Sequence, residues 1–134
     1  MIAVDTNVLI YFVEGSDEFG VAARSVLEQV ANKGGVVSSL VFAEFTAGQQ
    51  DASSASNLNA LLDGLIATGT LSVIPVDRAV AERAGRLRKL HHGVSLADAL
   101  HLACAQTAQA TIFYTNDLKL VKLGKVGKLV IKPL

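Results

Sequence analysis

The 134-residue chain has little cysteine, few aromatic residues and no long hydrophobic run. Its single cysteine, Cys104, excludes an internal disulfide scaffold and fits the reducing cytoplasm, and its apolar helical context favours a small core residue. Aromatic residues make up 5% of the chain, so Ala, Val and Leu must fill the core. No apolar run approaches the ~18 residues of a membrane span. Met1 leads directly into strand-type residues, so we expect no signal peptide.

Signals of several common enzyme classes are also missing. There is no Walker A or GxGxxG sequence, which disfavours nucleotide-driven and dinucleotide chemistry. No Ser-His-Asp constellation is evident, and one buried cysteine argues against thiol catalysis. What remains is an apolar chain, 51% hydrophobic, that is long enough to form one domain over residues 1–134.

Short strands alternate with helices along the chain. This alternation predicts an α/β fold in which helices cover both faces of a parallel sheet. We expect strands at 2–4, 36–38, 71–76, 111–114 and 129–131, and helices at 8–13, 16–34, 41–45, 58–67, 78–90 and 95–109. Pro75 places the third strand near an edge. Thr6 or Asn7 is expected to cap the first helix and Ser39 the third, with 48–56 as a loop or frayed helix.

Four acidic residues stand in apolar or small-residue segments, where a charge is costly to bury: Asp5, Glu44, Asp98 and Asp117. Asp5 and Asp117 directly follow expected strands, while Glu44 and Asp98 lie near helix starts. In parallel sheets, ligands bind beyond the carboxyl ends of the strands, and all four acids can converge on that edge. Their mutual repulsion is answered best by a hard divalent cation with oxygen ligands. The chain therefore predicts a metal-dependent enzyme.

Each acid also has an explanation that involves no metal. Asp5 could cap the helix that follows it, and Asp117 could be a turn residue. Asp98 fits a capping box that begins at Ser95. Capping explains Glu44 poorly. Together, the four positions are harder to explain by local structure than any one of them alone.

Asp98 and His101 are the only acidic or basic residues on the otherwise apolar helix expected at 95–109. Spaced i and i+3, they share a face of that helix. His101 could orient Asp98 beside a metal, or it could be a buried histidine with a structural hydrogen bond. The sequence leaves both open.

The net charge of zero hides an uneven distribution. Residues 1–77 have a balance of −7 and residues 78–134 a balance of +7. This asymmetry indicates a polyanionic ligand, although solvated helix faces and a lysine-rich edge strand would also produce it. We assign the expected phosphate contacts to some of five basic residues: Arg83, Arg86, Arg88, Lys89 and Lys119.

Four segments give the chain a family resemblance. They are IAVDTN at the start, VFAEF after the second strand, SLADALHLA in the late helix, and a strand ending in YTND. In order and spacing this set resembles the PIN-domain ribonucleases over essentially the whole chain. Within that group it is most similar to the VapC-like toxins of type II toxin–antitoxin pairs.

The resemblance implies a three-layer α/β/α domain with a central, mainly parallel five-stranded sheet. It implies an RNA-cleaving site in which Asp5, Glu44, Asp98 and Asp117 bind Mg²⁺ or Mn²⁺. Four further residues match positions that support such a site: Thr6, Asn7, Thr115 and Asn116. Segment 48–56 departs from expectation because it carries no basic residue, so RNA contact would rely on the basic second half.

The resemblance also implies a homodimer and a small antitoxin that inserts a peptide near the acids. The chain is too apolar to bury all its aliphatic side chains in one small core. Segment 8–13 is one expected source of an apolar patch for a partner, and the other is a set of leucines on the helix at 58–67: Leu58, Leu61, Leu62 and Leu65.

Two other functions remain compatible with the residues. One is a phosphoacceptor or phosphatase-type α/β domain that uses Asp5, although Thr6 and Asn7 stand where a paired acid is usual. The other is a catalytically weak PIN-like module that binds RNA or a partner without turnover.

Overall fold

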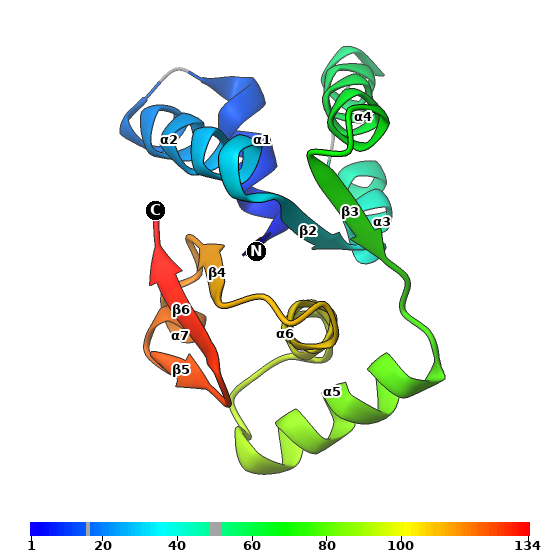
Figure 1. Cartoon of the computed structure of the whole chain (residues 1–134), viewed down its shortest axis with the longest axis vertical. Coiled ribbons are helices and arrows are strands. Elements are labelled where there is room, and N and C mark those ends of the chain that lie inside the picture. The colour runs from blue at the N-terminus through cyan, green and yellow to red at the C-terminus, as the bar shows by residue number, and fades with distance from the viewer. Residues whose placement is uncertain (16, 49–51) are drawn as a thin grey trace.

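A computed structural model describes residues 1–15, 17–48 and 52–134 of the chain, without the side chains of 52–55. In this part of the chain, strands form one sheet in the order β3-β2-β1-β4-β6-β5 (Figure 1). Their bounds are β1 Ile2–Val4, β2 Gly35–Ser38, β3 Leu71–Ile74, β4 Ile112–Thr115, β5 Lys125–Val126 and β6 Leu129–Pro133. All pairs are parallel except β5 with β6. The five expected strands are present and β3 lies at an edge. The expected count of five omits the two-residue β5.

Helices cover both faces of this sheet and give the three layers that the sequence predicts. Their bounds are α1 Thr6–Glu14, α2 Glu18–Lys33, α3 Leu40–Gly48, α4 Ala52–Ala67, α5 Arg78–Leu90, α6 Leu96–Thr107 and α7 Leu118–Val121. Helices α1 to α4 pack with one buried cluster that includes Val4 and Val37. Helices α5 to α7 pack with a second cluster around Ala3 and Phe113. Among the described residues, no helix is long and apolar enough to cross a membrane.

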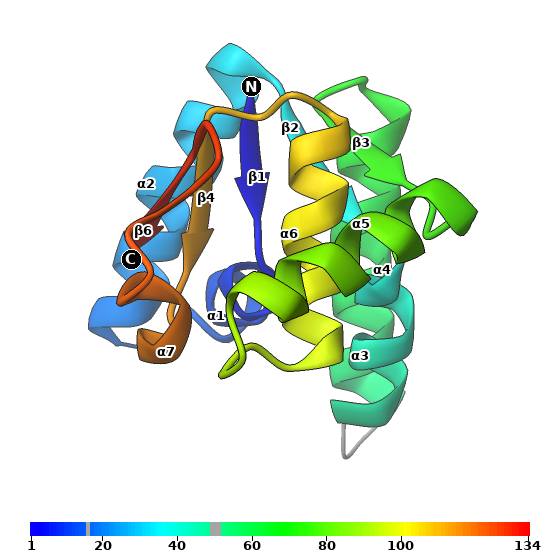
Figure 2. The same ribbon diagram turned by 90° about the horizontal axis from the view of Figure 1, so that it is seen from below.

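The parallel pairing of β1 and β4 places the ends of both strands at one edge of the sheet. Val4 is in register with Tyr114, and the backbone N–H of Asp5 donates to the Tyr114 carbonyl at 2.9 Å. Figure 2 shows the β1 and β4 arrows pointing to the same edge, where α1 and α7 follow them. Asp5 and Thr115, which are far apart in the sequence, therefore lie side by side.

Two expected helix caps are wrong. Asp5 caps α1 in place of Thr6 or Asn7, because its side chain accepts from the Thr6 backbone N–H. Ser39 does not cap α3 through its side chain, because its hydroxyl accepts from the backbone N–H of Val76 on the neighbouring connection. The preceding hydroxyl, that of Ser38, accepts from Leu40 at the start of α3. Ser16, expected at the start of α2, lies outside the described residues.

Of the loop or frayed helix expected at 48–56, the described residues agree with the helix, because α3 continues to Gly48 and α4 begins at Ala52. Residues 49–51 lie outside the described part of the chain. Alanine favours helix, and Leu58 and Leu62 anchor α4 because both are fully buried in the core. The sequence predicted that these two leucines and segment 8–13 would belong to a surplus apolar patch. This is wrong for both leucines, and also for Val8 and Leu9, which are fully buried. Leu61 and Leu65 are half-buried and pack against the margin of the core.

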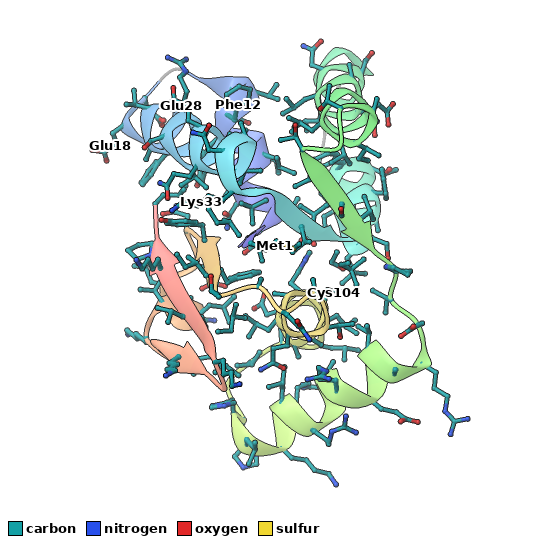
Figure 3. The ribbon with its side chains drawn as sticks, in the orientation of Figure 1. Met1, Phe12, Glu18, Glu28, Lys33 and Cys104 are labelled. Carbon is teal, nitrogen blue, oxygen red and sulfur yellow. The ribbon has the colours of Figure 1, made fainter. Side chains whose placement is uncertain are left out.

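Cys104 lies on α6 and packs toward the sheet, as expected for a core residue (Figure 3). Its Sγ contacts the Ile74 carbonyl at the end of β3 at 3.7 Å. Burial raises the pKa of the Cys104 thiol. The group is therefore a neutral core side chain with little nucleophilic character.

The turn between α1 and α2 depends on the close approach of two glycines. Gly15 has φ +60°, and a Cβ added at Gly20 would lie 2.7 Å from the Gly15 Cα. We predict that Gly20→Ala lowers the free energy of unfolding by about 1–3 kcal/mol, because the clash is with backbone that cannot rotate away. Urea denaturation measures this change.

Gly85→Ala is the matched control, since Gly85 lies in α5 and an added Cβ meets nothing within 4 Å. There the substitution is expected to stabilise the protein by about 0.5–1 kcal/mol through helix propensity. Equal stabilisation by both substitutions would contradict the close-packing explanation.

Candidate functional site

One cavity at the carboxyl edge of the sheet collects all four predicted acids. It has a volume of about 360 Å³ and is lined by Asp5, Thr6, Asn7, Ile10, Glu44, Gly48, Asp98 and Asp117. We call it the acid cavity. Its described lining holds four carboxylates and no lysine or arginine. The lining residues come from the ends of β1 and β4 and from the helices α1, α3 and α6.

Asp5 is the most deeply placed of the four acids, with 6% of its surface exposed. Its Oδ1 accepts from the Thr6 backbone N–H at 2.8 Å, and its Oδ2 accepts from the Thr115 hydroxyl at 2.7 Å. Burial raises the pKa of Asp5, and the charge of His101 with these hydrogen bonds offsets the rise only in part. The carboxylate is fixed in position but short of positive charge.

A hydrogen-bond network centred on Thr115 holds the edge together. The fully buried Thr115 hydroxyl donates to Asp5 and accepts from the backbone N–H of Asp117 at 3.0 Å. The Asn7 side chain reaches both Asp5 and Thr115 at 3.4 Å, and its Oδ1 accepts from the Asn116 backbone at 3.2 Å. The four residues expected to support the site are thus in place around the acids.

Glu44 on α3 is held by two groups from other elements. Its Oε1 accepts from the Thr6 hydroxyl at 3.1 Å and makes a short contact with Nε2 of His101. Burial raises the pKa of Glu44, but the His101 hydrogen bond and charge, with the Thr6 hydroxyl, outweigh burial, so the pKa is lowered. Glu44 therefore remains ionised at neutral pH.

His101 acts on different acids from the one that the sequence suggested. Its Nε2 contacts Glu44 and lies 4.0 Å from Asp5 Oδ1. The sequence left open either Asp98 on its own helix as the partner or a buried histidine with a structural hydrogen bond. Burial lowers the pKa of His101, but Glu44, Asp5 and Asp98 together raise it above its ordinary value. The imidazole reaches Glu44 because α6 packs against α3. His101 thus supplies positive charge to the buried acids.

Asp98 and Asp117 combine local helix capping with a place in the acid cavity. The Asp98 backbone N–H donates to the Ser95 hydroxyl at 3.1 Å, so the expected start of a capping box is present. Asp117 caps α7 by accepting from the Lys119 backbone at 2.9 Å. Burial and the nearby charges of Asp117 and Glu44 raise the pKa of Asp98, although the Ser95 hydrogen bond and His101 lower it.

The donor set fits a hard cation in kind. Carboxylate oxygens are the ligands that Mg²⁺ and Mn²⁺ prefer, and the raised pKa of Asp5 and of Asp98 shows that negative charge there is poorly compensated. Within the described ranges, however, no three His, Cys, Asp or Glu side chains are close enough to hold one ion as they stand. One oxygen of Glu44 is instead engaged by His101.

The five basic residues expected to contact RNA do not lie together. Lys119 lines a second cavity that shares Asp98 with the acid cavity. Arg83 lines a cavity at the opposite edge of the sheet, beside the residues that precede β4 and β6. The Arg88 side chain donates to the Val94 carbonyl at 3.2 Å, while Arg86 and Lys89 are exposed on α5.

Sequence reasoning missed Ile10 and Gly48 in the acid cavity and His91 and Lys122 in the neighbouring one. Only Lys122 carried a usable signal, because it follows Lys119 at a spacing of three residues. The others are placed by chain packing rather than by any local motif.

The position of the Thr115 hydroxyl between Asp5 and Asp117 leads to a stability prediction. Thr115→Val keeps the shape of the side chain but leaves the buried Asp5 Oδ2 and the Asp117 N–H short of a partner. We expect a loss of about 1–3 kcal/mol in the free energy of unfolding, measured by urea denaturation in EDTA.

Thr111→Val is the matched control, because the Thr111 hydroxyl is exposed and only reaches the Met1 carbonyl at 3.4 Å. Its expected change is below about 0.5 kcal/mol. If the two valine variants were equally stable, the Thr115 bridge would have no structural role.

Solved structures share this fold at low sequence identity. A toxin–antitoxin complex from Klebsiella pneumoniae contains a chain 23% identical, with a TM-score of 0.71 and coverage of 97% of this chain and 96% of that one. VapBC2 from Rickettsia felis, bound to a DNA fragment from their promoter, is 21% identical at 0.71, with 99% and 98% covered. VapC20 from Mycobacterium tuberculosis, a toxin that cleaves the sarcin-ricin loop, is 20% identical at 0.71, with 94% and 97% covered.

The family is identified from the amino-acid sequence. No curated protein matches the chain at a significant level. The PIN domain family matches residues 2–126, which confirms the resemblance seen in the four sequence segments. Because this match spans most of the chain and the fold agrees with it, the protein belongs to the PIN domain family.

Proposed function

We propose that this PIN-domain protein is a divalent-metal-dependent endoribonuclease that hydrolyses phosphodiester bonds in single-stranded or structured RNA. The observation that carries the proposal is the convergence of Asp5, Glu44, Asp98 and Asp117 on one cavity. Membership of the PIN family supports it, as does a structural neighbour that is an RNA-cleaving toxin. Membership of the PIN family also favours a nuclease over a phosphoacceptor domain that uses Asp5.

Asp5, Glu44, Asp98 and Asp117 would hold the cation, directly or through water. A bound Mg²⁺ or Mn²⁺ would supply positive charge for the phosphate and lower the pKa of a water molecule. The protein itself fixes the acceptors: Thr6 and Thr115 orient Asp5, while His101 and Thr6 orient Glu44. His101 also reduces the mutual repulsion of Asp5 and Glu44 before any cation binds.

Asp5→Asn tests this assignment. We expect it to remove RNA cleavage, because the most buried carboxylate loses its charge, while the free energy of unfolding stays within about 1–2 kcal/mol of the unsubstituted protein. Asn caps helices as well as Asp does, and the change relieves like-charge repulsion. Cleavage is measured on labelled RNA in Mg²⁺ or Mn²⁺, with products expected to carry a 5′-phosphate and a 3′-hydroxyl.

The matched control is Asp63→Asn, which removes an exposed carboxylate on α4. It should cleave as the unsubstituted protein does, and EDTA should stop both. Robust cleavage by Asp5→Asn, or by the unsubstituted protein in excess EDTA, would contradict the proposal once contaminating nuclease is excluded.

One observation favours a second candidate, an RNA- or partner-binding module without turnover. In the described residues the acids are not gathered closely enough to coordinate an ion, and Glu44 is paired with His101. RNA binding with no cleavage in either Mg²⁺ or Mn²⁺ would support this alternative.

We also propose that the protein is the cytoplasmic toxin of a toxin–antitoxin pair and forms a homodimer. Three of its structural neighbours come from toxin–antitoxin complexes or are themselves such toxins. The margin of α1 and α4 offers an apolar surface in which Leu61 and Leu65 are half-buried and Ile66 is exposed. A standard interface would cover ~800 Å² of each subunit. Antitoxin binding would place a basic side chain, most suitably an arginine, against the acid cavity.

Light scattering at micromolar concentration should give twice the monomer mass, and Ile66→Lys should shift the population toward monomer because it buries a charge in the interface. Val21→Lys, at an exposed apolar residue on α2, is the control that should remain dimeric.

The product of a neighbouring short reading frame should copurify with the protein and relieve its toxicity. A strictly monomeric protein that is harmless when expressed alone contradicts both parts.

A further inference from the structure

A second cavity opens beside the acid cavity and differs from it in character. It has a volume of about 420 Å³ and is lined by His91, Gly93, Val94, Asp98, Lys119, Leu120, Lys122 and Leu123. We call it the lysine cavity. Asp98 belongs to both linings, so the two cavities are adjacent. One presents carboxylates, and the other presents two lysines over an apolar floor.

We propose that the lysine cavity binds one nucleotide of the RNA chain, next to the phosphodiester that lies in the acid cavity. This inference rests on the proposed function and adds to it the place where a neighbouring nucleotide sits. The cavity is in the size range of small-molecule sites, which is about 300–1,000 Å³.

The lining separates apolar and charged groups in the way that a nucleotide requires. Val94 and Leu120 are buried and form the floor with the half-buried Leu123, which suits the flat face of a base. Lys119 and Lys122 are exposed, which leaves their ammonium groups free to reach a phosphate. A base on the floor and a phosphate at the rim would satisfy both halves of the lining.

The local structure fixes the lysines relative to the acids. Asp117 accepts from the Lys119 backbone N–H at 2.9 Å and begins α7. Lys122 directly follows this helix, three residues after Lys119, so both point from the same side of the turn. One helical turn therefore joins the acid cavity to the lysine cavity, and substrate bound in one is held in register with the other.

The opposite wall is a turn held by hydrogen bonds to backbone carbonyls. The Val94 N–H donates to the His91 carbonyl at 3.1 Å, and the Arg88 side chain donates through Nε to the Val94 carbonyl at 3.2 Å. A Cβ added at Gly93, between them, would meet nothing within 4 Å. The absence of a side chain at Gly93 keeps this wall open.

RNA suits these surroundings better than an acidic peptide does. An acidic peptide has to place further carboxylates beside Asp98 and Asp117. Asp98 already lines the lysine cavity, and Asp117 lines the adjoining acid cavity, so added negative charge there is unfavourable. A nucleotide carries one charge per phosphate and an uncharged base, which matches two lysines and an apolar floor.

Binding is tested first on the intact protein without RNA cleavage. Amide signals are followed by NMR in EDTA during titration with a 5′-mononucleotide and, separately, with inorganic phosphate. The mononucleotide should shift the signals of Gly93, Lys119 and Leu123, while those of Gly127 and Lys128 at the opposite edge stay unchanged. Phosphate alone should shift Lys119 but not Gly93.

Two variants then test the cavity with RNA. Lys119→Ala with Lys122→Ala should weaken binding of a single-stranded oligonucleotide about tenfold and reduce the salt slope by about 1.4, near 0.7 per phosphate contact. The control removes two other exposed lysines, Lys125→Ala in β5 with Lys128→Ala in the turn after it, and should change neither the affinity nor the salt slope. Gly93→Leu should fill the cavity and raise KM, while Gly64→Leu on α4, where an added Cβ also meets nothing within 4 Å, should not.

The outcomes separate this inference from the proposed function. Metal-dependent cleavage with no mononucleotide shifts at Gly93, and with both variants behaving as the unsubstituted protein, would overturn the lysine cavity alone. Mononucleotide shifts at Gly93 without any RNA cleavage would support the cavity as a nucleotide site while the nuclease proposal fails. Shifts at Gly93 produced only by an acidic peptide would overturn the RNA assignment.

Discussion

The burial of the Asp5 carboxylate is the constraint to which the rest of the site responds. It follows directly from the fold, because the parallel pairing of β1 and β4 carries residue 5 to the strand ends, at the start of α1 and beside His101 of α6. Taking that charge out of water is expensive unless hydrogen bonds and opposite charge compensate it. Thr6 and Thr115 provide the hydrogen bonds, and His101 provides part of the charge.

His101 links two of the acids in the cavity. Its imidazole contacts Glu44 and lies near Asp5, so the two acids share one group that can carry positive charge. The pKa of His101 is raised and that of Glu44 is lowered, which are the directions expected of an ion pair. A positively charged ligand that entered the acid cavity would compete with His101 for Glu44.

The sequence was informative wherever a signal was local. The four acids, the five longer strands and the cap at Ser95 all stand in short patterns whose chemistry can be judged from neighbouring residues. The contact between Glu44 and His101 could not be predicted this way, because it joins α3 to α6 and depends on how those helices cross. Strand β5 was missed because two residues carry no periodicity. The start of α4 was missed because its alanines and serines are also common in loops.

The two outermost strands of the sheet, β3 and β5, restrict how the molecule can associate with other chains. At one edge, β3 has four residues and is followed by the exposed Pro75. At the other, β5 has two residues between Gly124 and Gly127, both with positive φ, and carries Lys125 beside Lys128. Short, bent and charged edges are poor templates for a further strand. Continuation of the sheet from one copy into the next is therefore disfavoured, and contacts with other chains fall to the helical faces and to the open end where the acids lie.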